Sequence, residues 1–533
     1  MSETTKRCQV EMYDGKLCDR ELYDGKHCIF HSKSNDKDAK EFQCRFDDII
    51  KRALPKHYDF TGFVFPESFS FPKNLQRSVI FVGAVFNGVA DFSTTDFEGD
   101  VDFSLVMFKR KVGFTKAIFR GEDRFLETQF TDDADFDGST FEGRSSFASA
   151  TFNGNGQFIG CTFKQTANLH AVYFKNISDF SRTIFQAEAQ FWEAEFKDDS
   201  HFDQASFKRE AEFWEAGFKG RCRFDFACFE GKAVFEGARF ERHAHFEGAR
   251  FEGEANFWAD KSRESACFSS AIFYDALIMS RGTRTGRGST GDVDFRVVKL
   301  LDPAKVLFQK LDLSRFRFVE TDLRGVHFTD VEWYREKGKG RYKVFDEVSP
   351  DPYFKEFDYA LIRQLYRRLR ANYEDNLLYS EAGDFYIGEM EMRRKGETSI
   401  LKKLPILIYK VISNYGESYY RPLCWIAAML VLFPLLFMFA NIQPVSLDPT
   451  NPVGDVINYR LNFSSIESFT PTWEKLRDYY SCFLYSMSVF SFIRDKKYTT
   501  IDNWGHTLFV LESILSPVTL AFFLLALRRR FKR

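Results

Sequence analysis

The chain has 533 residues, enough for roughly three or four domains, and its net charge of −2 excludes the strong basic excess typical of nucleic-acid-binding proteins. The outlier in its composition is phenylalanine, with 64 residues against 14 prolines and 7 tryptophans. Ordinary cores draw mainly on leucine, isoleucine and valine, so this bias indicates a repeat that needs one ring shape at a recurring position. The ten cysteines are too sparse for a disulfide framework.

The N-terminal segment contains a candidate metal site. A Tyr-Asp-Gly-Lys turn occurs twice between cysteines, in CQVEMYDGKLC and CDRELYDGKHC, and CIFH follows. The resulting pattern C-x9-C-x9-C-x2-H contains Cys8, Cys18, Cys28 and His31. Three thiolates and one imidazole are a closed tetrahedral zinc set, and so short a segment has no core without such a staple. We expect residues 1–45 to be a separate module with a structural zinc. His27 or Cys44 could replace one ligand, and four unrelated polar side chains are the alternative interpretation.

The middle of the chain follows an 11-residue rhythm with two phenylalanines in each unit. From Phe81 to Phe273 the spacings alternate between 5 and 6, and of the 36 anchor positions only Leu169 and Ser262 are not phenylalanine. A small residue stands two places before most anchors, and a glycine often follows by two. This spacing is neither helical nor that of an ordinary strand, and it predicts a chain that turns a corner about every five residues with one ring inside each side. Two units form a coil of about 22 residues, so eight or nine coils build a rod on the order of 40 Å long.

The repeat, as in FEGARFERHAHFEGARFEG, resembles the pentapeptide-repeat family in a Phe-centred variant with an extra residue in alternate units. A five-residue register follows at 313–333, in DLSRFRFVETDLRGVHFTDVEW. The resemblance implies a right-handed quadrilateral β-helix, and we expect this all-β solenoid, with its cap, to occupy residues 46–335. The rings are expected to form its core. Because solenoids are scaffolds for recognition, this fold names no activity.

An arginine-rich segment interrupts the solenoid at 281–296, in RGTRTGRGSTGDVDFR. Guanidinium groups and flexible backbone N–H groups suit phosphate oxygens, so the candidate ligand is an anion such as a nucleotide or oligonucleotide. Its candidate residues are Arg281, Arg284, Arg287 and Arg296. Asp292 and Asp294 dilute this charge, and a solvated surface loop is the alternative. The sequence contains no Walker motif, Rossmann fingerprint or Ser-His-Asp arrangement, so we expect no enzyme activity.

Residues 336–420 are expected to form a helical connector. Apolar residues recur at spacings of three and four over 359–373, with arginines around them. The segments YRRLRANYEDNLLYSEAGDFYIGEMEMRRK and SNYGESYYRPL resemble a connector of bacterial membrane proteins that join pentapeptide repeats to channel-like C-termini. That resemblance implies transmission between a rod and a pore, and a passive helical spacer is the alternative.

Two apolar segments near the C-terminus are each long enough to cross a bilayer of about 30 Å. The first is LCWIAAMLVLFPLLFMFANI at 423–442, and the second is GHTLFVLESILSPVTLAFFLLAL at 505–527. Lysines and arginines flank the outer ends of both, so the positive-inside rule predicts cytosolic termini and places 443–504 on the other side. We therefore expect residues 421–533 to form a two-span transmembrane domain in the cell (inner) membrane.

Between the spans, YYSCFLYSMSVFSFI at 479–493 is short for a span and favours a re-entrant or interfacial helix. This order of segments resembles two-helix potassium-channel-like pores, but it departs from them at the filter, where SVFSFIRDKKYTT stands in place of TVGYG. Glu512 either faces the bundle interior or pairs near the interface with His506 or Arg494. The candidate pore and gating residues are Ser486, Ser488, Ser491, Glu512, Ser516 and Pro517. A plain anchor with a surface helix between its spans is the alternative.

Together these patterns predict a cytosolic sensor rod on an oligomeric membrane pore, with a homo-tetramer favoured. Such a chain would act as a gated channel or as a membrane-permeabilising effector, and it resembles membrane effectors of bacterial anti-phage defence systems. The competing hypothesis is a membrane-tethered scaffold whose rod binds a protein partner while the spans only anchor it.

Overall fold

The computed structural model describes residues 7–34, 37–51, 57–258, 265–280, 291–336, 339–350, 356–444, 456–457, 472–491 and 498–531. The chain divides into two compact units, Met1–Phe357 and Asp358–Arg533. The first unit is a β-solenoid with short helices near its ends. The described part of the second unit is helical apart from one pair of short strands.

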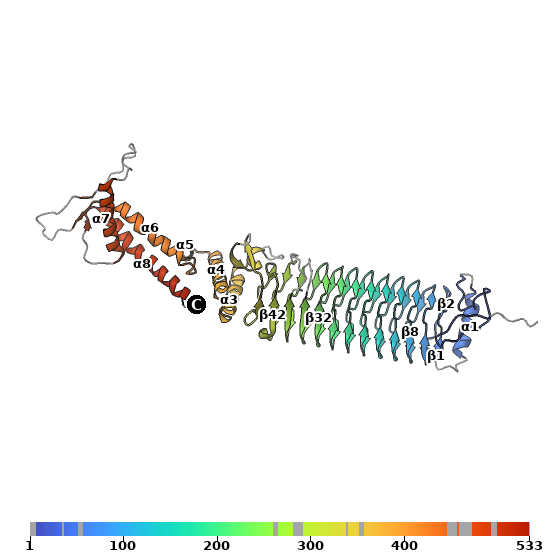
Figure 1. Ribbon diagram of the computed structural model, residues 1–533. Coiled ribbons are helices and arrows are strands. Elements are labelled where there is room, and N and C mark those ends of the chain that lie inside the picture. Colours follow the sequence, from blue (N-terminus) through green and yellow to red (C-terminus); the bar gives the residue numbers. More distant parts are fainter. Residues whose placement is uncertain are drawn as a thin grey trace, which may run out of the picture. The chain divides into compact units, whose positions relative to one another are not determined.

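Four parallel sheets form the sides of the solenoid, and Figure 1 shows their strands stacked along its axis. Within the described residues, the longest sheet has 13 strands, from β1 (His57–Asp59) to β44 (His327–Thr329). Two sheets have 11 strands, from β6 (Ala90–Asp91) to β43 (Phe316–Arg317) and from β3 (Asn74–Leu75) to β41 (Lys299–Leu300), and the fourth has 9, from β2 (Val64–Phe65) to β33 (Arg239–Phe240).

The register of the strands follows the 22-residue coil that the spacing predicts. β11 (Ile118–Phe119) pairs with β15 (Thr140–Phe141), so that Phe119 lies opposite Phe141. The solenoid fold is therefore confirmed, and it extends beyond the eight or nine coils expected between Phe81 and Phe273. The alternating rhythm does not reveal the end coils, because the anchors buried there, such as Phe60 and Leu277, fall outside its register.

The phenylalanine rings fill the solenoid in four columns. Along a column they stack, as for Phe119 and Phe141, whose centroids are 4.8 Å apart with planes 4° apart. Between columns they meet edge to face, as for Phe114 and Phe125 at 5.7 Å and 87°. Both are preferred geometries for aromatic pairs, which explains why one ring type recurs. All described anchors are buried except Phe240, which is half-buried.

The coil has two kinds of corner, and each kind makes a different demand on the backbone. Two residues after every second anchor the backbone has a positive φ, as at Lys116 (56°) and Glu127 (54°), and a backbone hydrogen bond to the next coil holds each of them there. After the other anchors the corner passes close to the preceding coil. A Cβ at Gly143 would lie 2.0 Å from the carbonyl oxygen of Gly121, so glycine is needed at this corner for the two coils to approach.

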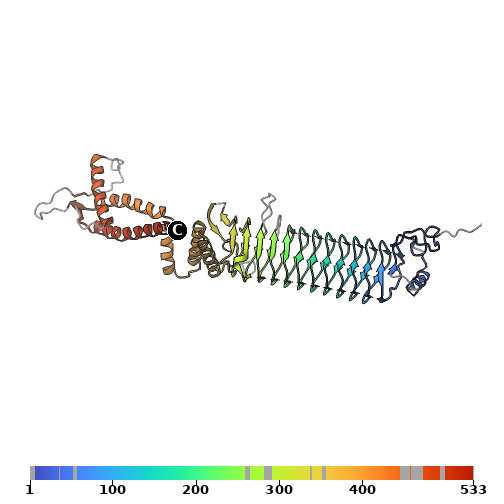
Figure 2. The same cartoon turned by 60° about the horizontal axis from the view of Figure 1, so that its bottom comes forward.

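Residues of the N-terminal segment close the first end of the solenoid. Helix α1 (Ala39–Lys51) lies at this end of the solenoid in Figure 2. Its side chains Phe42 and Phe46 are buried and contact rings of the first coil. The ring of Phe46 lies 4.9 Å from that of Phe60, and Phe30 stacks on Phe63 at 4.6 Å. The segment predicted as a separate module thus shares one aromatic core with the first coil.

The other end of the first unit carries short elements. These are the 3-10 turn η1 (Pro303–Lys305), the strand pair β45 (Tyr334–Glu336) and β46 (Lys339–Lys343), and helix α2 (Phe345–Val348). The buried carboxylate of Asp346 in α2 accepts a hydrogen bond from the backbone N–H of Phe318 at 3.0 Å. This contact joins the helix to the last coils, where it acts as a cap.

The second unit begins with two packed helices, α3 (Tyr359–Asp375) and α4 (Tyr379–Gly396). Asp358 caps α3, because its side chain accepts hydrogen bonds from the N–H groups of Ala360 and Leu361. The two helices pack closely at Gly388, where a Cβ would lie 2.5 Å from the ring of Tyr366. α5 (Ile400–Ser413) follows and ends at Asn414, which has a left-handed backbone.

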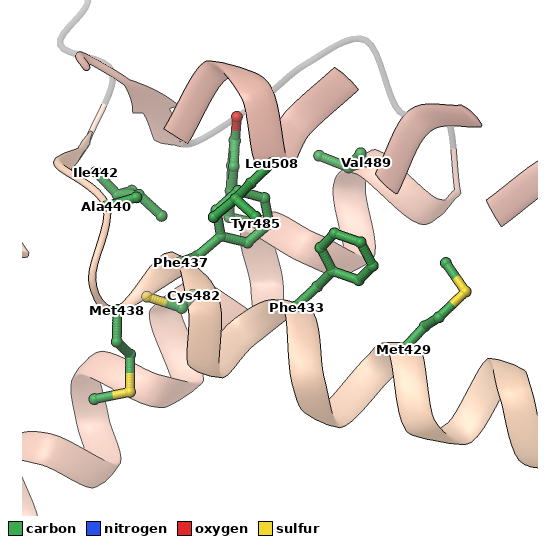
Figure 3. Packing of buried hydrophobic residues seen from close by; sticks show 10 residues of the cluster. All are labelled: Met429, Phe433, Phe437, Met438, Ala440, Ile442, Cys482, Tyr485, Val489 and Leu508. Carbon is green, nitrogen blue, oxygen red and sulfur yellow. The ribbon is translucent and has the colours of Figure 1, made fainter. Parts of the chain in front are cut away.

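Three helices form the apolar bundle at the C-terminus: α6 (Tyr420–Phe437), α7 (Trp473–Phe490) and α8 (Asn503–Phe531). Strands β47 (Ile442–Pro444) and β48 (Tyr498–Thr500) pair beside them. Figure 3 shows the core of the bundle, where Phe433 and Phe437 of α6 lie close to Tyr485 and Val489 of α7 and Leu508 of α8.

α6 and α8 are long and apolar enough to cross a membrane. α6 begins three residues before the predicted span and ends at Phe437, and α8 extends the second predicted span at both ends. α8 also continues without interruption through the candidate gating residues Ser516 and Pro517. The predicted short helix between the spans is α7, which begins at Trp473 instead of residue 479 and packs against both spans.

Candidate functional site

The structure brings the four predicted metal ligands together. The two Tyr-Asp-Gly-Lys turns, with Gly15 at φ 77° and Gly25 at φ 82°, reverse the chain so that successive cysteines return to the same point. The ligand atoms all lie within 4.8 Å of one another, and they belong to Cys8, Cys18, Cys28 and His31. His27 instead faces Asp24 at 3.6 Å, and Cys44 is exposed on α1.

The distances within this cluster fit a tetrahedral ion. The sulfurs of Cys18 and Cys28 are 3.7 Å apart, and Nδ1 of His31 lies 3.4 Å from the Cys8 sulfur and 3.3 Å from the Cys28 sulfur. Zinc bonds of about 2.3 Å to sulfur and about 2.0 Å to nitrogen give tetrahedral edges of about 3.5–3.8 Å. The residues therefore fit zinc in distance as well as in type.

Contacts around the cluster favour the forms of His31 and Cys18 that can bind a metal. Nε2 of His31 lies 3.0 Å from the carbonyl oxygen of Thr61, a contact that leaves Nδ1 as the ligand atom. The hydrogen bond between Cys18 and Cys28 lowers the pKa of the Cys18 thiol and raises that of the Cys28 thiol, so that Cys18 loses its proton first. The Arg20 guanidinium donates to the Cys18 sulfur at 3.2 Å and favours this thiolate. The thiolate is the form that binds metals. Since Thr61 belongs to the first coil, the cluster is tied directly to the solenoid.

A second predicted site is a polar group inside the helical bundle. Ser486 of α7 donates a hydrogen bond to Oε1 of Glu512 in α8, and both side chains are fully buried. Within the described residues, Oε2 of Glu512 and Oγ of Ser516 are buried without a hydrogen-bond partner. The side chain of Glu512 thus lies in the bundle interior, which is the first of its two predicted positions. The ring of His506 stacks on Phe509, and Arg494 lies outside the described residues.

The other predicted pore residues do not join this group. Ser488 donates to the carbonyl oxygen of Tyr485 at 2.7 Å, and Ser491 donates to that of Met487 at 2.6 Å. Both hydroxyls thus donate to backbone carbonyl oxygens of their own helix. The structure reduces the candidate polar site from six residues to Ser486, Glu512 and Ser516.

The predicted anion site lies mostly outside the described part of the chain, which omits Arg281, Arg284 and Arg287. Arg296 is described, and its guanidinium forms a two-point pair with Asp294, with distances of 2.8 Å and 2.7 Å. The fork geometry that would suit a phosphate is thus directed at a neighbouring carboxylate in this structure.

Sequence reasoning missed a cluster that joins the connector to α8. The buried Glu391 of α4 contacts Lys410 at 2.8 Å and Arg394 at 2.9 Å and accepts a hydrogen bond from the Tyr415 hydroxyl at 2.8 Å. Although burial alone would raise it, these three contacts lower the pKa of Glu391 to about 2. The carboxylate therefore stays charged at neutral pH and holds α4 to α5 and to the turn after α5.

Arg529 adds α8 to the same cluster. Its guanidinium lies 3.7 Å from the centre of the Tyr386 ring and 3.0 Å from Glu417, and it donates to the carbonyl oxygen of Tyr415 at 3.4 Å. Tyr415 and Glu417 belong to the SNYGESYYRPL segment, which resembles a connector. No spacing rule links this segment to Arg529, because Tyr415 and Arg529 are 114 positions apart in the sequence.

One side of the solenoid also carries exposed aromatic residues that sequence reasoning missed. Trp192 and Trp214 are exposed one residue after anchors of the same column, and the ring of His170 lies 6.4 Å from that of Trp192. Exposed aromatic side chains in register on neighbouring coils are a feature of recognition surfaces. The sequence did contain a sign of this surface, because the two tryptophans are 22 residues apart and each directly follows an anchor phenylalanine.

The comparisons with known proteins concern the solenoid. The family model for pentapeptide repeats (9 copies) matches residues 125–172 and 213–259. An uncharacterized protein of Methanocaldococcus jannaschii is 28% identical over 157 residues, which cover 26% of this chain and 34% of that protein. The match thus spans about a third of that relative's length. No solved structure matches the chain.

Proposed function

Since the chain carries pentapeptide repeats in a β-solenoid, followed by two helices able to cross a membrane, we propose that it is a gated membrane pore with a solenoid sensor. The observation that carries this proposal is the polar group of Ser486, Glu512 and Ser516 in an otherwise apolar bundle. A carboxylate in a membrane helix is costly, and such residues typically face an aqueous cavity or an ion path inside the bundle.

Two spans from one chain cannot enclose such a path, so the pore requires several copies. The outward faces of α6 and α8 carry exposed apolar residues, including Val431, Leu432, Ile514 and Leu525, which can contact lipid or neighbouring copies. We propose a homo-oligomer, with a tetramer favoured, in which ligand binding to the solenoid biases the pore through α3, α4 and α5. Opening would permeabilise the membrane, as an effector of a bacterial defence system does.

Removing the charge at Glu512 is expected to reduce cation flux through the purified protein in liposomes by about tenfold or more, because the carboxylate is the buried charge of the proposed path. The comparison is between wild type, Glu512→Gln and Glu474→Gln. Glu474 lies exposed in the first turn of α7, so its substitution is the matched control and should leave flux unchanged. Equal flux in all three proteins would remove Glu512 from the path.

The exposed Trp192 and Trp214 favour a second candidate function, a membrane-tethered scaffold whose solenoid binds a protein partner. The flux experiment separates the two functions, because a scaffold gives no flux in wild type. A partner captured by wild type and lost on replacing both tryptophans with serine would then support the scaffold.

The topology of the proposed pore follows from its basic flanks, and both termini are placed in the cytosol. Cysteines introduced at Tyr498 and Phe531, in a chain without its exposed native cysteines, test this arrangement. A membrane-impermeant maleimide added to intact cells from the non-cytosolic side should label position 498 and leave 531 unlabelled until the membrane is opened. The reverse pattern would invert the orientation.

We further propose that Cys8, Cys18, Cys28 and His31 bind one structural zinc. All four positions of a tetrahedral site are filled by protein ligands, so the ion would have no open position for catalysis. Its proposed role is to hold the N-terminal segment as the cap of the solenoid.

A further inference from the structure

Helix α5 presents a wide apolar face that no described part of the chain covers. Ile400 is 81% exposed, Leu401 83% and Leu404 52%. At about 100° per residue, the exposed apolar positions span roughly 160° of the helix circumference without a charged residue. They are Ile400, Leu401, Leu404, Pro405, Leu407, Ile408 and Val411. An apolar surface of this width on a single helix marks an interaction site.

The opposite face of α5 is packed, so the direction of the apolar face is set by the fold. Ile406 lies in a small core with Met390 of α4 and Tyr415. Tyr409 stacks on Phe522 of α8 at 5.5 Å. Because two different helices hold the inner face, α5 cannot rotate its exposed leucines inward without breaking these contacts.

α5 also lies where both candidate spans reach their basic ends. The chain passes from Ser413 to Tyr420 in one short turn, and Arg421, in the first turn of α6, donates to the carbonyl oxygen of Lys410 at 3.3 Å. Arg529 in the last turn of α8 donates to the carbonyl oxygen of Tyr415, directly after α5. These arginines mark the level at which α6 and α8 would leave the hydrocarbon.

We propose that α5 lies in the membrane interface, with its apolar face among the acyl chains and with Lys402, Lys403 and Arg421 at the headgroups of anionic lipids. The inference rests on the proposed function in one respect, that α6 and α8 cross a bilayer. Lipid is favoured over a second copy of the chain for two reasons. One short turn joins α5 to α6, which carries exposed apolar residues such as Leu423 near its start, and the charged residues of α5 are all basic, which complements anionic headgroups.

Photocrosslinking in lipid nanodiscs tests the position of α5. The full chain, carrying p-benzoylphenylalanine at Leu404, is placed in discs of phosphatidylcholine and phosphatidylglycerol at a ratio of about 7:3 and irradiated. We expect lipid adducts at position 404 by mass spectrometry. Val431, which is exposed on α6, is the positive control, and Leu126, which is exposed on the solenoid, is the negative control.

The outcomes separate this inference from the proposed function. Adducts at 431 without adducts at 404 overturn the interfacial position of α5 alone, and a crosslinked dimer from 404 assigns its face to a second copy. Neither a lipid adduct nor a crosslinked dimer at 431 refutes the membrane assignment itself, and the inference fails with it. Adducts at 404 together with adducts at 431 support both.

The preference for anionic lipid has its own measurement. Native mass spectrometry of the full chain released from the same discs counts the phosphatidylglycerol that remains bound. We expect the double substitution Lys402→Gln and Lys403→Gln to reduce this retention several-fold. Lys164→Gln with Lys208→Gln, which removes the same charge from the solenoid, should leave it unchanged. Equal retention in both variants contradicts the headgroup contact.

Discussion

Replacing Phe185 by alanine is expected to destabilise the solenoid around it by about 3–5 kcal/mol, the usual loss for a buried ring. Phe185 is fully buried and stacks between Phe163 at 5.1 Å and Phe207 at 5.0 Å, while Phe191 meets its edge at 6.0 Å. The substitution removes the transfer free energy of the ring and these aromatic contacts, and the rigid hydrogen-bonded coils on both sides cannot collapse into the space.

The effect should be local, because each coil of a solenoid contacts only its neighbours. Hydrogen exchange of the full chain is the measurement, and amides of the coils that hold Phe163 and Phe207 should exchange about two to three orders of magnitude faster. Phe226→Ala is the matched control, since this ring is 63% exposed at a corner. Equal effects of the two substitutions would show that the rings are not the source of the stability.

Removal of the metal is expected to open the N-terminal cap and to loosen the first coil. Structural zinc contributes on the order of 10–16 kcal/mol in small peptides at pH 7. Here the cap shares its core with the coil, through the ring stack of Phe30 on Phe63 and the hydrogen bond from the N–H of Val64 to the carbonyl oxygen of Phe30 at 2.7 Å. Chelation should therefore speed hydrogen exchange at Val64, whereas a separate module would leave it unchanged.

Elemental analysis tests the ligand set directly. We expect about one zinc per purified wild-type chain, none in Cys28→Ser, and an unchanged content in Cys44→Ser, whose thiol lies outside the cluster. Wild-type protein without stoichiometric metal would falsify the zinc site. Retention of the metal in Cys28→Ser would instead point to a different ligand set.

The resemblance to pentapeptide repeats and the C-x9-C-x9-C-x2-H spacing were sufficient to predict the solenoid and the members of the metal cluster. In both cases the information is local. A chain that turns a corner every five or six residues places one ring inside each side of the coil, and two equal turns return successive cysteines to one place. The predicted spans were equally readable from apolar length. The half-buried Phe240 shows the limit of the pattern, since it occupies the same kind of anchor position as the buried rings.

The sequence by itself therefore determined the coil length, the ring core, the members of the Cys/His cluster and the two apolar helices, since each is set by spacing along the chain. Only the tertiary structure decided that Ser486 pairs with Glu512, that Glu391 and Arg529 join the connector to α8, and that the Cys/His cluster is tied to the first coil. It also decided which face of α5 stays exposed. These contacts join residues far apart in the sequence, and their partners depend on how helices and coils pack, which no local period encodes.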